Sequence, residues 1–402
     1  MARVVIVGAG QAGRRCAEAL RDLDPEAEIV LLGEEPHPPY DRPPLSKAVL
    51  LGADPGNGLF VRAPEFYAAR RIALRTGARV AAIEPAAGRV VTEAGERIGY
   101  DALVLATGAR ARRLAVPGAE DPRVLTLRTL DDAAALRARL LARPRVAVVG
   151  GGLIGLEVAA AACRLGCAVT VLEAAERLMA RCVPPAVSDL VAALHRARGV
   201  TLHLGQALRA IEPRPGGLVL DAGAVRVEAE LVVAGIGGVP NTTLAEAAGL
   251  AVRDGILTDA QGRSSAEGIY AAGEVARFPH PFLGRAARLE SWQVAQNQPA
   301  AVARALCGEA APYDEIPWLW TDQFDWNLQV LGDPDPAFEL VRRPAGEGRA
   351  TFLALDAGGR VRGAVLLNNG REATPCRRLI AAGKAVDRAR LADPEVPLRQ
   401  LA

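Results

Sequence analysis

Two glycine-rich segments of the chain have the spacing that lets a protein backbone approach a phosphate group closely. The first is Gly8-Ala-Gly-Gln-Ala-Gly13 and the second is Gly150-Gly-Gly-Leu-Ile-Gly155. In such a segment the first glycine permits a tight turn, the second leaves room beside the backbone, and the third lets a helix pack closely on a strand. Because the N–H groups at the start of that helix favour a negative charge, each segment predicts a pyrophosphate site.

Each glycine segment lies within the same longer pattern, so the chain contains an internal repeat. Apolar runs at residues 4–7 and 146–149 precede the glycines, a helical stretch follows, and a second apolar run ends at an acid. These acids are Glu34 and Glu173, and a carboxylate there accepts hydrogen bonds from an adenosine ribose. One glycine motif alone is weak evidence, but two in matching strand–turn–helix–strand units predict two dinucleotide sites.

Two dinucleotide sites in one chain indicate an oxidoreductase that passes electrons between two cofactors. A nicotinamide delivers two electrons as hydride and a flavin accepts them, so we expect FAD at the first site and NAD at the second. The Glu173 carboxylate suits a 2′-hydroxyl and repels a 2′-phosphate, which favours NAD over NADP. Arg177 and Arg181 follow closely in the sequence and weaken that preference.

Further strands place these sites in an α/β fold with two Rossmann-like dinucleotide-binding domains. The apolar runs that end at Thr107-Gly108 and Gly235-Ile-Gly237 close the two domains, and Gly273-Glu274 follows a third run, where a carboxylate can reach a ribityl hydroxyl. The first domain is then discontinuous, with the second inserted into it. Alternating strands after residue 315 predict a C-terminal α+β domain. The expected ranges are 1–111 and 234–315 for the FAD domain, 112–233 for the NAD domain and 316–402 for the C-terminal domain.

Composition and charge narrow the class of protein. Among 402 residues, 48 are Lys or Arg and 46 are Asp or Glu, and a net charge of +2 gives no reason to expect nucleic acid as a partner. No apolar run is long enough to span a membrane, and the apolar start is too short for a signal peptide, so we expect a cytoplasmic protein. The six cysteines and four histidines have no metal-ligand spacing, and no metal is expected.

The segment Pro39-Tyr-Asp-Arg-Pro-Pro-Leu-Ser-Lys47 resembles the flavoprotein reductases of oxygenase systems, within the class of glutathione-reductase-like flavoproteins. The resemblance covers nearly the whole chain and includes residues 150–157, 235–241, 290–298 and 318–324. The tail is most similar to the reductase component of 3-phenylpropionate/cinnamate dioxygenase. The resemblance implies an FAD-dependent ferredoxin–NAD reductase. Electrons would pass from NADH through FAD to a small two-iron ferredoxin, which feeds an aromatic-ring dioxygenase or a P450 monooxygenase.

Disulfide reductases of this class carry a redox dithiol beside the flavin, but here no cysteine lies between Cys16 and Cys163. Electrons therefore cannot pass to an internal disulfide, and an external acceptor is required. Two alternatives stay open at this point: a rubredoxin reductase, and an NADH-gated flavin-binding interaction protein similar to apoptosis-inducing factor. An NADH oxidase or peroxidase is disfavoured because its active cysteine is missing.

The resemblance also implies roles for individual residues. Lys47 is expected near flavin N5 and O4, where its charge stabilises the reduced flavin, and Glu157 is expected beside the nicotinamide, paired with Lys47. Trp320 matches an aromatic residue on the electron exit. These three are the candidate catalytic residues. Taken together, the expected cofactor contacts are Gly8, Ala9, Gly10, Gln11, Ala12, Gly13, Glu34, Glu35, Arg42, Lys47, Val80, Thr107, Gly108, Arg112, Arg128, Gly150, Gly152, Leu153, Ile154, Gly155, Glu157, Glu173, Arg181, Gly235, Ile236, Gly237, Gly273, Glu274, Glu290, Ser291, Trp292 and Trp320.

Two positions depart from the family pattern. Glu274 stands where relatives carry Asp, and Phe324 stands where they often carry Tyr, so Phe324 is given no role. For docking of an acidic ferredoxin, a basic patch is expected to steer the encounter. The alternative is that these arginines are solvated surface residues of an arginine-rich chain. The candidate groups are Arg70-Arg71, Arg110 with Arg112-Arg113, Arg342-Arg343 and Arg377-Arg378.

Overall fold

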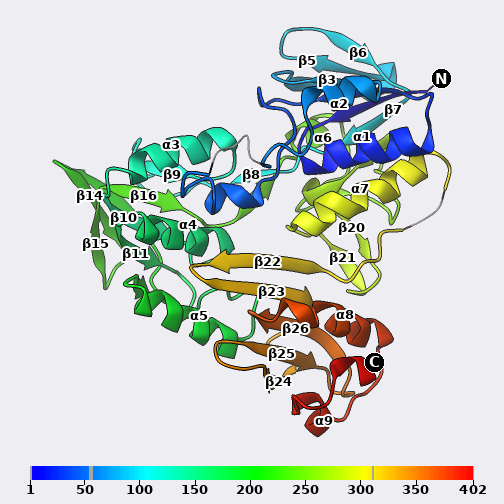
Figure 1. Ribbon diagram of the computed structural model, residues 1–402. Coiled ribbons are helices and arrows are strands. Elements are labelled where there is room, and N and C mark those ends of the chain that lie inside the picture. Colours follow the sequence, from blue (N-terminus) through cyan, green and yellow to red (C-terminus); the bar gives the residue numbers. More distant parts are fainter. Residues whose placement is uncertain (1, 54–57, 310–311, 402) are drawn as a thin grey trace. The chain divides into compact units, whose positions relative to one another are not determined.

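The computed structural model describes residues 2–53, 58–309 and 312–401, and the chain divides into two compact units (Figure 1). Unit 1 contains Met1–Asp41, Pro55–Arg110 and Gly238–Glu315. Unit 2 contains Arg42–Asp54, Ala111–Gly237 and Ile316–Ala402. The short segment Arg42–Asp54 thus belongs to unit 2, although the segments before and after it belong to unit 1.

The centre of unit 1 is a five-stranded sheet in which every neighbouring pair is parallel. Helix α1 (Gln11–Leu23) and helix α7 (Trp292–Leu306) lie side by side (Figure 1) and pack on one face, where Ile6, Cys16 and Val302 share a core. The opposite face buries Val5 in a second core, which also includes Val90. A parallel sheet covered on both faces is typical of a doubly wound fold. The strand order is β19 (Ile269–Ala271), β7 (Ala102–Leu105), β1 (Arg3–Val7), β2 (Glu28–Leu32), β3 (Ile72–Arg75).

Smaller elements complete unit 1. Two three-stranded sheets pack against the main sheet through apolar residues such as Ile83, Ile256 and Phe278. The first contains β4 (Val80–Glu84), β5 (Arg89–Thr92) and β6 (Arg97–Gly99), and the second contains β18 (Ile256–Leu257), β20 (Ala276–His280) and β21 (Arg285–Ala287). The remaining helices and paired strands are α2 (Pro64–Ala69), α6 (Thr243–Ala247), β8 (Ala109–Ala111) and β17 (Gly238–Pro240).

Unit 2 begins with a second parallel sheet of the same kind. Val148, Val171 and Val233, one from each of its three inner strands, are almost completely buried. The strand order is β12 (Thr201–His203), β11 (Ala168–Leu172), β10 (Arg145–Val149), β16 (Leu231–Ala234), β9 (Val124–Thr126). The helices and the added antiparallel sheet are α3 (Leu130–Leu140), α4 (Leu153–Arg164), α5 (Pro185–Ala197), β13 (Ala210–Arg214), β14 (Gly217–Asp221) and β15 (Arg226–Ala229).

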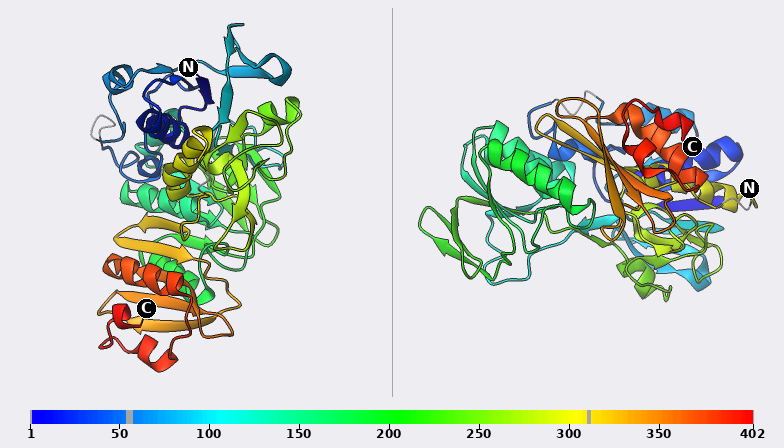
Figure 2. Two further views of the ribbon diagram at one scale, coloured as in Figure 1. Left: turned by 90° about the vertical axis from the view of Figure 1, so that its right-hand side faces the viewer. Right: turned by 90° about the horizontal axis from the view of Figure 1, so that it is seen from below.

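The C-terminal part of unit 2 is an antiparallel sheet that shares a core with α4 and α5. One sheet face packs Leu328, Val330 and Val365 against Leu156 and Val191, which come from those helices. The last helices follow the sheet in the chain (Figure 2). The strand order is β22 (Trp318–Gln323), β23 (Trp326–Gly332), β26 (Val361–Leu367), β25 (Ala350–Leu355), β24 (Glu339–Pro344), and the helices are α8 (Ala373–Ala382) and α9 (Arg388–Ala392).

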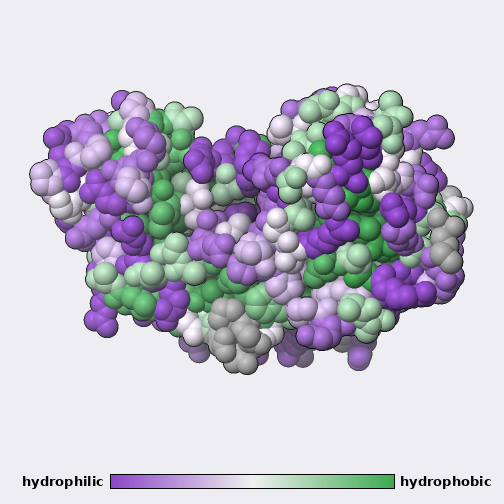
Figure 3. Space-filling model, turned by 90° about the horizontal axis from the view of Figure 1, so that it is seen from above, coloured by the Kyte–Doolittle hydropathy of each residue, from purple (hydrophilic) through white to green (hydrophobic). Residues whose placement is uncertain are grey.

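The predicted fold class, two Rossmann-like sheets followed by an α+β region, is confirmed. The strand predicted before Thr107 is β7, the strand before Gly235 is β16, and the strand before Gly273 is β19. On the face drawn in Figure 3, hydrophilic side chains are interspersed with smaller groups of apolar ones. Within the described ranges, no helix is long and apolar enough to cross a membrane.

Candidate cofactor sites and a buried ion pair

The first glycine segment forms a cradle at the start of α1. Gly8 has φ +112°, and a Cβ there would lie 2.2 Å from the Ala106 carbonyl oxygen. A Cβ on Gly13 would lie 1.8 Å from the Gly8 carbonyl oxygen, whereas one on Gly10 would meet no atom within 4 Å. No side chain caps α1, so its first N–H groups are available to an anion. The tight turn predicted at Gly8 and the close packing predicted at Gly13 are confirmed, and the contact of Gly10 with a pyrophosphate stays a prediction.

The second glycine segment repeats this geometry at the start of α4. Gly150 has φ +109°, and its Cβ would lie 2.5 Å from the Gly235 carbonyl oxygen. A Cβ on Gly155 would lie 2.1 Å from the Gly150 carbonyl oxygen, and one on Gly152 would again meet nothing within 4 Å. Helix α4 also lacks a side-chain cap. The chain therefore carries two backbone cradles that suit a pyrophosphate.

The predicted Gly273-Glu274 turn lies against the first cradle. A Cβ on Gly273 would come within 2.5 Å of Ala12 Cβ, and the Gly273 N–H donates to Gln298 Oε1 at 2.8 Å. Glu274 follows in a 3-10 turn and is half-buried. Thr107 follows β7, the strand that pairs with β19, and its Oγ1 donates to the carbonyl of Asn241 at 2.8 Å. The structure thus brings distant predicted contacts of the first site together within unit 1.

The acids predicted near the first site differ in their surroundings. Glu34 has a side chain that is 63% exposed and lies 3.7 Å from Arg79, so its carboxylate is open to a ligand hydroxyl. Glu35 accepts a hydrogen bond from Tyr40 Oη at 2.5 Å. Val80 is buried at the first position of β4.

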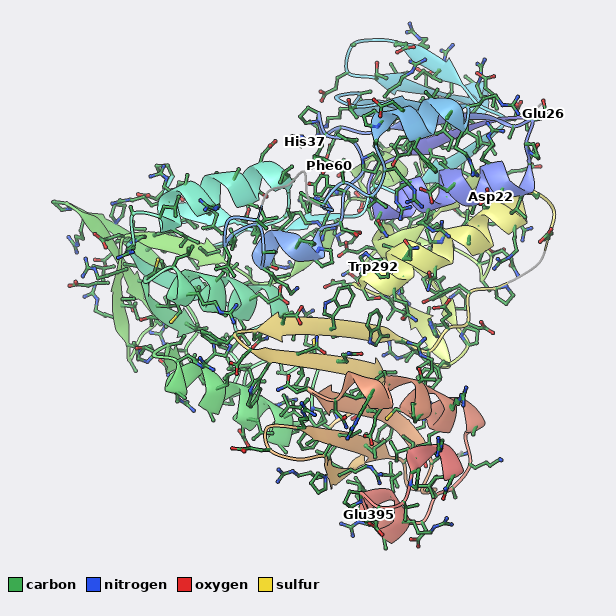
Figure 4. The ribbon with its side chains drawn as sticks, in the orientation of Figure 1. Asp22, Glu26, His37, Phe60, Trp292 and Glu395 are labelled. Carbon is green, nitrogen blue, oxygen red and sulfur yellow. The ribbon has the colours of Figure 1, made fainter. Side chains whose placement is uncertain are left out.

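The predicted contacts at the start of α7 are held by their neighbours. Ser291 caps the helix by accepting from the Val294 N–H at 3.3 Å. Trp292 stands at this helix start (Figure 4), and its Nε1 donates to Asp41 Oδ1 at 2.9 Å. Glu290 accepts from Arg288 Nη2 at 2.6 Å.

Glu173 follows β11 and folds back on the second cradle. Its Oε2 accepts from the Gly151 N–H at 2.5 Å and its Oε1 accepts from the Ala175 N–H at 2.7 Å. Arg177 donates to two carbonyls of its own loop at 2.7 and 2.8 Å, so its charge is engaged there. Arg181 Nη2 reaches to within 3.4 Å of the Cβ position of Gly237. Of the two arginines that weakened the NAD preference, Arg177 is bonded within its own loop and Arg181 approaches the loop at Gly237.

Unit 2 contains an ion pair between the partly buried Lys47 and the buried Glu157. Lys47 Nζ lies 2.9 Å from Glu157 Oε1, and the Glu157 residue is 3% exposed. Two hydroxyls also donate to this carboxylate: Ser46 Oγ to Oε2, and Thr321 Oγ1 to Oε1 at 2.5 Å. The predicted pairing of Lys47 with Glu157 is confirmed. Neither hydroxyl partner was predicted from the sequence.

The segment that carries Lys47 belongs to unit 2 and packs on its helices. Its short 3-10 helix, Pro43–Ser46, contains two prolines, which fix φ, and it contacts α3 and α4. Arg42 Nη1 donates to the Arg128 carbonyl at 2.7 Å. The Arg112 N–H donates to the Gly237 carbonyl at 2.9 Å, in the loop beside the second cradle.

Trp320 and Thr321 are adjacent on β22, so their side chains point to opposite sheet faces. The Trp320 ring stacks on Trp318, with 4.9 Å between the ring centroids and 22° between the planes. Because Thr321 bonds to Glu157, Trp320 lies on the sheet face away from that carboxylate. The structure therefore brings Lys47 and Glu157 together and places Trp320 on the other side of the same strand.

The hydrogen bonds beyond Thr321 reach a buried histidine on α5. Gln323 Nε2 donates to Thr321 Oγ1 at 3.3 Å, and Gln323 Oε1 lies 2.9 Å from His195 Nε2. His195 is fully buried, and its ring meets that of Phe324 edge-on at 5.1 Å. Burial lowers the pKa of His195, and its bond to Gln323 opposes that shift in part. The alternation along β22 places Thr321 and Gln323 on one face, which is the only signal in the sequence that pointed to them.

The prediction that Arg343 takes part in docking is wrong. Arg343 is 3% exposed and lies 3.3 Å from Glu372, and its guanidinium donates to carbonyls of the C-terminal segment. It cannot meet a protein partner because its donors are used inside unit 2. Its neighbour Arg342 is exposed, as the alternation of a strand requires.

Comparison with known proteins assigns the chain to a family. Residues 2–299 match the family described as pyridine nucleotide-disulphide oxidoreductase, and residues 318–402 match the reductase C-terminal family. The chain belongs to the pyridine nucleotide-disulphide oxidoreductase family. This membership confirms the expectation of an oxidoreductase with FAD and a nicotinamide dinucleotide as cofactors.

Relatives within this family are similar along their whole length. The ferredoxin–NAD(+) reductase component of the anthranilate 1,2-dioxygenase system of Burkholderia cepacia is 48% identical, over 98% of each chain. The 3-phenylpropionate/cinnamic acid dioxygenase component of Photorhabdus laumondii is 37% identical over 94% of this chain and 95% of that one, which confirms that this component is a relative. The crystal structure of a covalent putidaredoxin reductase–putidaredoxin complex matches with a TM-score of 0.94 and 36% identity, covering 100% of this chain and 98% of the other.

The residues of the first cradle fit FAD. Only glycine fits at Gly8 and Gly13, the backbone at Gly10 is open, and the uncapped start of α1 offers N–H groups to a pyrophosphate. The exposed Glu34 carboxylate is accessible to the hydroxyls of a ribose. The second cradle fits NAD on the same grounds, with Glu173 as its acid.

Proposed function

We propose that this protein is an NADH-dependent ferredoxin reductase. The observation that carries the proposal is the pair of open glycine cradles in one chain, since a hydride relay needs two dinucleotides at once. The named relatives support the class of acceptor, because the anthranilate component is a ferredoxin–NAD(+) reductase and the matched complex contains putidaredoxin. The ferredoxin in turn would feed an oxygenase.

Each cofactor is assigned to one cradle. Gly8, Gly10 and Gly13 hold the FAD pyrophosphate, and Glu34 binds its ribose. Gly150, Gly152 and Gly155 hold NADH in the same way, with Glu173 as the acceptor for its 2′-hydroxyl. FAD supplies the chemistry that the side chains lack, namely acceptance of a hydride and release of single electrons. The other predicted contacts, such as Arg112 and Trp292, are proposed to bind around these cradles.

The side chains of unit 2 contribute charge and position. Lys47 Nζ carries the positive charge proposed to face the flavin, and Glu157 Oε1 holds that ammonium at 2.9 Å. The Glu157 side chain is 2% exposed and the Lys47 side chain 18% exposed, so the pair is largely shielded from water, and charges act more strongly there than in open solvent. Trp320, stacked on Trp318, supplies an aromatic surface on the electron exit. No general acid or base is needed for hydride transfer.

The partners follow from this chemistry. NADH is the donor and a small iron–sulfur ferredoxin is the acceptor, docked through exposed arginines such as Arg342. We place the protein in the cytoplasm, where NADH is supplied.

The test is an anaerobic stopped-flow measurement of flavin reduction, first with NADH and then with NADPH. Fast bleaching with NADH and slow bleaching with NADPH are expected. Reoxidation by a two-iron ferredoxin must then exceed reoxidation by a rubredoxin. A faster rubredoxin reaction would favour the rubredoxin reductase alternative. Slow reduction by both nucleotides would refute the reductase assignment and favour an NADH-gated binding protein.

A further inference from the structure

A chain of four buried hydrogen-bonding groups ends at the Glu157 carboxylate. From α5 to α4 it contains His195, Gln323, Thr321 and Glu157, with successive donor–acceptor distances of 2.9, 3.3 and 2.5 Å. The four residues are at most 3% exposed. Lys47 Nζ meets the same Glu157 oxygen, Oε1, as Thr321 does.

The chemistry of the groups gives this chain one direction. An ionised carboxylate only accepts hydrogen bonds, so Thr321 Oγ1 must donate its single hydrogen to Glu157. The Thr321 lone pair then accepts from Gln323 Nε2, which fixes the orientation of that amide. Gln323 Oε1 is left to accept, so His195 must carry its proton on Nε2. Hydrogen bonds that run in one direction polarise and strengthen one another.

The chain also fixes the strand that carries Trp320. Thr321 and Gln323 lie on the face of β22 toward α4 and α5, and Trp320 is on the other face of the same strand. The β22–β23 turn is clamped as well: Arg164 Nη2 donates to the Phe324 carbonyl, and Arg198 pairs with Asp325 at 2.5 Å. Sliding or rotation of the strand would therefore break the buried bonds of Thr321 and Gln323 as well as these exposed contacts of the turn.

We propose that Thr321 is a positioning residue of the reductase reaction, which orients the Glu157 carboxylate and the paired Lys47 ammonium through the His195–Gln323–Thr321 chain. Thr321 touches neither cofactor in this role and acts only through Glu157. The inference rests on the proposed function, because the positioned pair is the one assigned to face the flavin. The chain of bonds itself can be tested without that function.

The first test compares three variants of the FAD-loaded enzyme. Thr321→Val removes the donor but keeps the side-chain shape, and Thr321→Ser restores the hydroxyl. Thr351→Val is the matched control: Thr351 is fully buried in the same sheet and also donates to a carboxylate, that of Glu372, at 2.5 Å. Both valine variants should therefore lose similar stability in thermal unfolding.

Single-turnover reduction by NADH separates position from stability. In Thr321→Val the rate constant at saturating NADH should fall about tenfold, since small displacements of reacting groups slow a reaction strongly, while the NADH concentration for half-maximal rate stays within about twofold. Thr321→Ser should recover most of the rate, and Thr351→Val should react like the wild type. Equal slowing in Thr321→Val and Thr351→Val would overturn the proposal.

A second readout does not depend on activity. With ¹⁵N-labelled histidine, the holoenzyme has only four histidines to resolve, and His195 is assigned by its loss in His195→Gln. The wild type should show the neutral Nε2–H tautomer, and its signal should shift in Thr321→Val but not in Thr351→Val. An Nδ1–H tautomer would refute the chain. If NADH does not reduce the wild type, the proposed function is refuted. The ¹⁵N spectrum still shows whether the hydrogen bonds from His195 to Glu157 run in the direction inferred here.

Discussion

Lys47 and Glu157 lie 2.9 Å apart although 110 positions separate them in the sequence, and both belong to unit 2. Lys47 is supplied by a short segment that leaves unit 1 and returns to it. A carboxylate that is 3% exposed is thus paired with a lysine from outside its own Rossmann sheet.

Replacing Lys47 should therefore reduce stability as well as activity. In Lys47→Met a buried carboxylate keeps two hydroxyl donors but loses its counter-ion, which costs about 3 kcal/mol of unfolding free energy. Urea unfolding measures this. Lys384→Met is the control, since Lys384 is the other lysine of the chain and is exposed, and its change should stay within about 0.5 kcal/mol. Equal stability of the two variants would contradict a buried pair.

Glu173→Ala should weaken the preference for NADH over NADPH. The variant loses an acceptor for the ribose 2′-hydroxyl and a repulsive charge against a 2′-phosphate. A hydrogen bond to a charged group contributes about 1.5–3 kcal/mol, so the ratio of kcat/KM values should fall by roughly tenfold or more. Steady-state rates with both nucleotides measure it. In Glu176→Ala, an exposed neighbour, the ratio should be unchanged.

Arg343→Met should loosen the end of the chain. The guanidinium donates to the carbonyls of Leu391, Pro394 and Val396 at 3.3, 3.1 and 2.8 Å, near Glu395, which is labelled in Figure 4. Its loss also leaves Glu372 without its ion pair, which costs about 3 kcal/mol. Thermal unfolding and limited proteolysis of the last residues should both reveal the change. The control is Arg342→Met, one position earlier and exposed. It should change neither the thermal stability nor the proteolysis of the last residues.

The stability of the protein should decrease as the pH falls below about 6.5, the usual pKa of histidine. Burial lowers the pKa of His195 and of His280 in the folded protein. Below that pH the unfolded chain binds more protons than the folded one, so acid favours unfolding. Above that pH the two histidines are neutral in both states, and their full contribution to stability is present. Unfolding free energies measured between pH 5 and 8 should fall less steeply in His195→Gln and in His280→Gln. If the slope of unfolding free energy against pH stays unchanged in both variants, these two histidines are not the source of the acid sensitivity.

The cradles could be predicted from the sequence because their requirements are local. A left-handed φ at Gly8 and a close helix at Gly13 are met by glycine alone, whatever surrounds them. The parallel strands followed from short apolar runs in the same way.

The rest of the site depends on contacts that no local pattern contains. Thr321 reaches Glu157 across 164 positions, and Ser46 reaches it across 111. A threonine in a strand is ordinary, and only the packing of β22 on α4 gives it a carboxylate to bind. Arg343 was misread for a similar reason, because arginine is rarely buried and its acceptors come from a loop about 50 residues later.

The path of the chain between the two units has a consequence for genetic exchange between relatives. The segment Ala111–Gly237 contains Glu157 but none of its donors: Ser46 and Lys47 come from Arg42–Asp54, and Thr321 comes from Ile316–Ala402. A chimaera that received only the middle segment would combine one parent's carboxylate with the other parent's lysine and hydroxyls. Recombination that keeps these four residues together must therefore move three separate stretches of the gene, and single crossovers between divergent reductases should be selected against.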